Sequence, residues 1–88
     1  MVVNDSLQES VKDVFLTFLE NIGRAVWVEI VTEDPQCTYY FGPFVGEPEA
    51  REATIGYVED LKSEGAVGID VRSIKRMRTP AVLTIFDE

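Results

Sequence analysis

Histidine is absent from this 88-residue sequence, and cysteine occurs once, at Cys37. Histidine is the commonest general base and the commonest metal ligand in proteins. Its absence excludes a Ser/His/Asp or Cys/His nucleophile, a zinc finger and a histidine pH switch. A single cysteine forms no internal disulfide and no Cys-x-x-Cys site, and this usage is typical of the reducing cytosol.

Long apolar runs and positive charge are also scarce. No apolar run approaches the roughly 20 residues that span a bilayer, and no basic segment introduces a signal peptide. We therefore expect a cytoplasmic protein without membrane insertion. Eight Lys and Arg residues stand against sixteen Asp and Glu, a formal net charge of −8. Nucleic acids and anionic membranes carry charge of the same sign, which argues against both as partners.

The N-terminal part of the chain has a strong helix pattern. Residues 1–5 are expected to form a frayed tail, and Ser6 with Glu9 makes a capping box. An amphipathic helix is predicted over residues 6–22, ended by Gly23 in the left-handed conformation. The apolar stripe of this helix consists of Leu7, Val11, Val14, Phe15, Phe18, Leu19 and Ile22. We expect the helix to pack on a sheet; the alternative is that it leaves the domain to dimerise or to dock on a partner.

A β-hairpin is predicted next. Residues 25–32 are rich in β-branched and aromatic side chains, which is typical of a strand. Residues 33–36 have the composition of a turn, and residues 37–41 predict the returning strand. We expect Gly42-Pro43 to break that strand and Phe44 to anchor the connection that follows.

The remaining pattern is helix, strand, strand. A second helix is predicted from Glu47 or Pro48 to the Ser63-Glu64-Gly65 segment, and the last strand over residues 81–86. Alternation from residue 67 to residue 72 predicts a third strand whose buried face carries Val67, Ile69 and Val71. The whole predicts one α+β domain over residues 1–88, with a core over residues 25–88. Its small, mostly antiparallel sheet packs against the helices, and the second and third strands run parallel if they share that sheet.

No constellation of catalytic residues emerges. Glu33 and Asp34 offer oxygen ligands for calcium or magnesium, but a calcium loop needs more alternating ligands and a glycine. Sixteen acidic residues on a small surface make some close carboxylate pair inevitable, so such a pair is not specific for glycoside chemistry. Cys37, inside a predicted strand, is typical of a buried hydrophobe. We therefore predict no catalytic residue, no metal site and no cofactor.

Two features favour contact with another protein. The first is an aromatic group on the hairpin, formed by Trp27, Tyr39, Tyr40, Phe41 and Phe44. Tyr39 and Tyr40 are consecutive in a strand and point to opposite faces, so at least one meets the second layer or a partner. The group packs as core and cross-strand pairs or forms a protein-facing patch.

The second feature is a basic segment formed by Arg72, Lys75, Arg76 and Arg78. Residues 72–88 carry four cations and two carboxylates, a net charge of +2. Residues 1–71 carry four cations and fourteen carboxylates, a net charge of −10. The basic segment fits docking on an acidic protein surface, internal compensation of the acidic helices, or an anion site.

Four stretches of the sequence are distinctive: Trp27-Val28-Glu29-Ile30, Cys37-Thr38-Tyr39-Tyr40-Phe41-Gly42-Pro43-Phe44, Tyr57-Val58-Glu59-Asp60-Leu61 with Gly65-Ala66, and Leu83-Thr84-Ile85-Phe86-Asp87. Through them the chain resembles, over residues 25–88, a family of small cyanobacterial proteins catalogued as a domain of unknown function. The resemblance implies a soluble, cytoplasmic cyanobacterial protein linked to the photosynthetic apparatus, and it implies no catalytic residue.

The stretch from Phe41 to Gly65 is also similar in topology to two other domains. One is the strand–turn–helix–strand unit of sporulation-related repeats, which bind peptidoglycan in the periplasm. The other is the small linker domain that caps phycobilisome rods and fills a protein cavity. The missing signal peptide favours the second likeness, although topology alone carries little functional weight.

These observations predict a non-enzymatic protein–protein interaction module, an accessory or linker-like partner in a cyanobacterial photosynthetic complex. The predicted contact residues are Tyr39, Tyr40, Phe44, Arg72, Lys75, Arg76 and Arg78. One alternative is a homo-oligomer held by the first helix and an open strand edge. The other is a domain that senses a small ligand or a divalent ion through its acidic turn.

Overall fold

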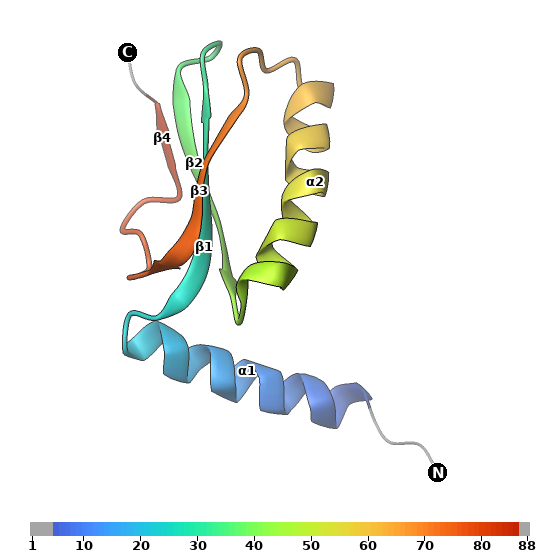
Figure 1. Cartoon of the computed structure of the whole chain (residues 1–88), viewed down its shortest axis with the longest axis vertical. Helices are drawn as coiled ribbons and strands as arrows, with labels where there is room; N and C mark the ends of the chain where they lie inside the picture. The colour runs from blue at the N-terminus through green and yellow to red at the C-terminus, as the bar shows by residue number, and fades with distance from the viewer. Residues whose placement is uncertain (1–4, 87–88) are drawn as a thin grey trace.

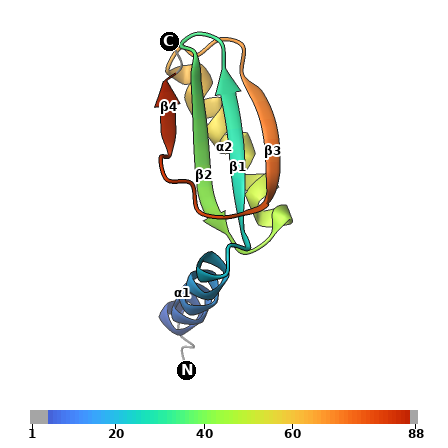
Figure 2. The same cartoon turned by 90° about the vertical axis from the view of Figure 1, so that its left-hand side faces the viewer.

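A four-stranded antiparallel sheet in the order β3-β1-β2-β4 forms the centre of the molecule (Figures 1 and 2). The computed structural model describes residues 5–86, with side chains from residue 11 onward. The elements are α1 (Asp5–Asn21), β1 (Ala25–Thr32), β2 (Cys37–Phe44), α2 (Glu47–Ser63), β3 (Asp70–Met77) and β4 (Thr84–Phe86). The predicted α+β class, element order and mostly antiparallel sheet are confirmed. Strands β2 and β3 do run parallel, but β1 lies between them.

The core forms where β1 meets α2. Val26, Val28 and Ile30 of β1 are fully buried, and Ala50 and Leu61 of α2 pack against them. Alternate residues of a strand share one face, so these three β1 side chains all point toward the helix. The small Ala50 lets α2 approach the sheet closely. The same face of α2 positions the half-buried aromatic rings of β2.

The opposite face of the sheet is crossed at one end by the chain between β3 and β4 (Figure 2). Because these two strands lie at opposite edges, their connection crosses β1 and β2 on the face away from α2 (Figure 2). On this face Trp27 is only 2% exposed. Its Nε1 has no hydrogen-bond partner among the described residues. Packing of the indole ring, rather than a polar contact, therefore fixes its place.

Strand β2 does not end at Phe41, so the predicted break at Gly42-Pro43 is wrong. The register passes from Val28 opposite Phe41 to Val26 opposite Phe44, which makes a bulge. A Cβ added at Gly42, where φ is 151°, would lie 2.8 Å from Cε3 of Trp27. Glycine is therefore needed for the Trp27 ring to pack on the strand, and Phe44 continues the strand as its last residue.

Strand β3 lies further along the chain than predicted. It begins at Asp70, and the expected buried face is wrong for Val67 and Val71, which are exposed, whereas Ile69 packs against the core. Val67 instead exchanges backbone hydrogen bonds with Asp34 of the hairpin turn, in an isolated bridge. This bridge holds residue 67 outside the strand. As a result, most of the basic segment lies within β3 rather than after it.

The predicted end of the first helix is confirmed. Gly23 has a φ of 71°, and the amides of Gly23 and Arg24 donate to the carbonyls of Glu20 and Leu19, which is a Schellman motif. The predicted tail at residues 1–5 is wrong at Asp5, where the helix begins, and the rest of it lies outside the described residues. The Ser6–Glu9 capping box lies outside the described side chains. None of the described helices has the length and apolar character to cross a membrane.

Candidate protein-interaction surface

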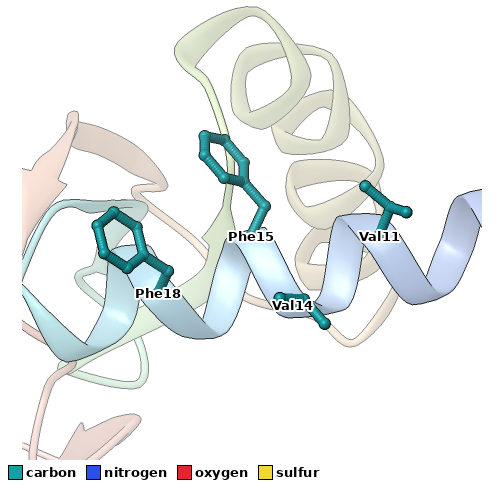
Figure 3. A pocket seen from close by; sticks show the side chains of 4 residues that line it. All are labelled: Val11, Val14, Phe15 and Phe18. Atoms are coloured by element: carbon teal, nitrogen blue, oxygen red, sulfur yellow. The ribbon is translucent and has the colours of Figure 1, made fainter.

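The N-terminal helix α1 leaves a band of large apolar side chains in solvent. Val11, Val14, Phe15 and Phe18 are 63%, 72%, 50% and 56% exposed. We call these four residues the α1 face; they line a shallow groove of about 520 Å³, and Figure 3 shows them along one stretch of the helix. Ile22 continues the band toward the sheet at 53% exposure. Single exposed apolar residues are ordinary, whereas a contiguous patch marks an interaction site.

Helix α1 lies across the end of the sheet and not on one of its faces (Figure 1). Among the side chains of α1 that the structure describes, Leu16 and Leu19 on its other side are partly buried and lie toward the body of the domain. Leu16 shares a small pocket with Val45 and Glu49, which follow β2 and open α2. The expected packing of the apolar stripe on the sheet is therefore not found for the α1 face.

The junction between α1 and β1 is held by residues of the basic segment and its neighbour. Arg76 Nη1 donates a 2.7 Å hydrogen bond to the carbonyl of Arg24, and Thr79 Oγ1 donates one of 3.3 Å to Oε2 of Glu20. The side chain of Arg78 lies directly against Gly23. Cations near a helix C-terminus also complement its dipole. These contacts hold α1 at its angle to the sheet and so keep the α1 face turned outward.

The four predicted cations are not gathered into one patch. Arg72 pairs with Asp70 at 3.2 Å, and both side chains are more than half exposed. Arg76 and Arg78 lie at the α1 junction. Lys75 is opposite Trp27 in the register, on the sheet face away from α2. Internal contacts therefore account for three of the four, and docking by this segment stays a prediction.

The predicted aromatic residues are divided between the two faces of the sheet. Tyr39 and Phe44 lie on the α2 side, where Phe41 stacks on Tyr57 of α2 with ring centroids 4.1 Å apart. Tyr39 stacks on Phe41 at 6.0 Å. Tyr40 is opposite Glu29 in the register and so lies on the other face. The expected division of Tyr39 and Tyr40 is confirmed.

A pocket of about 170 Å³ opens beside these stacked rings. Tyr39, Phe41 and Tyr57 line it together with Leu61, the Asp60 carboxylate of α2 and the Glu64 carboxylate just after that helix. A hydrogen bond to the Cys37 thiol and burial raise the pKa of Tyr39 above its ordinary value of 10.0. Ligand pockets usually enclose about 300–1,000 Å³, so this one is small, and its rings are largely occupied with one another.

One protein family, a domain of unknown function (DUF1816), matches residues 19–85. The chain belongs to this family. The search of curated proteins and the search of solved structures each found no match. The resemblance inferred from the sequence is confirmed, although the DUF1816 match begins earlier, at Leu19.

The DUF1816 match covers the sheet, α2 and the α1 junction, but the α1 face precedes it. The Arg76, Thr79 and Gly23 contacts that hold α1 all lie within the matched span. The family domain therefore contains the support, and the chain before residue 19 provides the exposed surface.

The acidic turn of this DUF1816 domain serves a structural contact. Asp34 forms the backbone bridge to Val67, and the Glu33 side chain lies against Gly68. Among the described residues, no three His, Cys, Asp or Glu side chains lie together as a metal site would require. The turn thus offers no support for divalent-ion binding.

The sequence predicted a contact on the first helix only as an alternative, either in a homo-oligomer or against a docked partner, and the predicted contact residues lay on the hairpin and the basic segment. A signal was present, because at 100° per residue the apolar side chains from Val14 round to Leu16 span roughly 200° of the helix. One contact needs a stripe only about half as wide. A helix with so wide an apolar arc has two faces to bury, and the DUF1816 body covers one.

Proposed function

We propose that this protein is a non-enzymatic protein–protein interaction module whose docking surface is the α1 face. The observation that carries the proposal is the exposure of Val11, Val14, Phe15 and Phe18 on a helix whose orientation is held by specific contacts. In a frayed helix, the exposure of apolar residues would not indicate a binding surface. A helix with a capped end, an anchoring arginine and a half-buried opposite side presents them in a defined place.

The proposal also concerns the complex and the compartment in which the protein acts. We propose an accessory or linker-like partner in a photosynthetic complex of the cyanobacterial cytoplasm, on the strength of the sequence resemblance. The single, buried Cys37 suits a reducing compartment. Lys75 and Tyr40, on the sheet face away from α2, are proposed as a secondary contact for an acidic partner surface.

A pair of matched variants tests the α1 face. Phe15→Glu combined with Phe18→Glu places charge in the groove, and glutamate is a good helix former. Ile55→Glu makes the same kind of change at a 64% exposed site on α2. Circular dichroism should show an unchanged fold in both, because all three side chains are largely in solvent.

The readout is in-cell crosslinking of the tagged chain in a cyanobacterium. We expect a defined crosslinked product for the wild type and for Ile55→Glu, and its loss in the double variant. The product counts whether it contains another protein or a second copy of the chain. The same product from all three proteins would show that the α1 face is not the docking surface.

A further inference from the structure

We propose that the occupant of the α1 face is a second copy of this chain, bound as an antiparallel helix pair. This inference rests on the proposed function and names the partner of the same surface. Three observations carry it: the area of the α1 face, the charge around it, and the order of its side chains.

The area of the face is right for a modest homodimer. The α1 face and Ile22 are exposed by half to nearly three quarters. At roughly 150–200 Å² per side chain this leaves on the order of 500 Å² of apolar surface. Two such faces bury about 1,000 Å² together, the lower limit for a specific interface. No second surface is needed to reach it.

Charge around the face favours neither sign in a partner. Residues 11–24 carry Lys12, Asp13, Glu20 and Arg24, a net charge of zero in a chain of −8, and the first turns of α1 add Asp5 and Glu9. A surface built for a strongly charged partner has complementary charge at its rim. The absence of net charge along residues 11–24 instead lets two identical helices meet there without local repulsion. The remaining carboxylates repel over a longer range, which salt screens.

The order of the side chains selects the antiparallel arrangement. Val11 stands at one end of the face, Phe18 at the other, and Val14 with Phe15 between them. An antiparallel pair packs each valine against a phenylalanine. A parallel pair packs phenylalanine on phenylalanine and leaves the smaller valine side chains to fill the other end of the interface. Antiparallel packing also aligns the helix dipoles favourably. Finally, it places the two acidic bodies, each joined at an α1 C-terminus, at opposite ends.

Sedimentation velocity of the full chain tests the pairing directly. From low micromolar to near-millimolar concentration we expect a monomer–dimer equilibrium that strengthens as salt is raised, because the protomers repel. Phe15→Glu with Phe18→Glu should abolish it, and Ile55→Glu should leave it unchanged. A monomer at all concentrations, or a dimer that the double variant retains, would overturn the proposal. A dimer weakened by salt would overturn the charge argument on which it depends.

Cysteine pairs test the direction of the helices. In an antiparallel pair Val14 lies near its own copy at the twofold axis, so Val14→Cys should form an intermolecular disulfide under mild oxidation. Val11→Cys alone should not, but a mixture of Val11→Cys and Phe18→Cys chains should crosslink. Self-crosslinking of Val11→Cys as efficient as that of Val14→Cys would show a parallel pair. The buried Cys37 is common to all these chains, and the wild type controls for it.

The two proposals fail in different ways. A monomeric wild type whose crosslinked partner in cells is another protein, lost in the double variant, overturns the second copy and leaves the interaction module standing. A double variant that changes neither the sedimentation nor the crosslinked product overturns both.

Discussion

The two helices of this protein have the same length, 17 residues, but they differ in how far their apolar side chains are buried. Helix α2 buries one side against the sheet through modest apolar side chains such as Ala50 and Leu61. Helix α1 carries the larger apolar side chains, Phe15 and Phe18, and leaves them in solvent. If hydrophobicity alone decided burial, the order would be reversed. From this difference we infer that α2 is part of the core of the domain, whereas α1 presents its apolar side chains at the surface.

The largest expected effect is a difference in unfolding free energy between a substitution in α2 and a substitution in α1. Leu61→Ala removes a 4% exposed side chain from the core and should lower the free energy of unfolding by about 2–4 kcal/mol. Val14→Ala, at 72% exposure, should change it by less than about 0.5 kcal/mol. Urea unfolding measures both, at a concentration low enough to keep the protein monomeric. A loss from Val14→Ala comparable to that from Leu61→Ala would break the comparison, because α1 would then belong to the core.

A smaller effect is expected at the junction that holds α1. Arg76→Ala removes the hydrogen bond to the carbonyl of Arg24, an exposed contact worth about 0.5–1 kcal/mol. The more specific result is faster amide exchange at the last turn of α1 with no change in α2. Lys75→Ala, one residue earlier on β3, is the matched control and should leave both helices unaffected. Equal exchange in the two variants would show that the arginine does not brace the helix.

The same contrast explains what the sequence could and could not predict. The bounds of β1 and the position of the hairpin turn follow from local composition, and they were predicted as found. The shift of β3 was not, because it depends on the bridge between Val67 and Asp34, which are distant in the sequence. Local patterns also revealed the stripe of α1, but not the side that meets the body. That depends on where Val45 and Glu49 lie in space.

The candidate site was predicted least well for the same reason. Arg72, Lys75, Arg76 and Arg78 are close in sequence, and a cluster of charges suggests a patch. In a strand, however, successive side chains alternate between faces, and each here finds a different neighbour. The contact between Arg76 and Arg24 joins residues that are far apart in the sequence and meet only because β3 pairs with β1, so only the folded chain shows that the basic segment supports α1.

The smallest expected effect concerns the layer under α2. Because the pKa of Tyr39 is raised, the folded state holds its phenolic proton more tightly than the unfolded state does. The stabilising contribution is therefore complete below pH 10, the unfolded value, and is lost as the pH rises through the folded value. The difference in unfolding free energy between the wild type and Tyr39→Phe should be flat from pH 7 to 9 and shift against the wild type above pH 10. Subtraction removes the titrating groups that do not interact with Tyr39, which both proteins share. If the wild type instead became more stable relative to Tyr39→Phe above pH 10, the site would stabilise the phenolate. The surroundings of Tyr39 under α2 would then be more polar than the stacked rings of Phe41 and Tyr57 indicate.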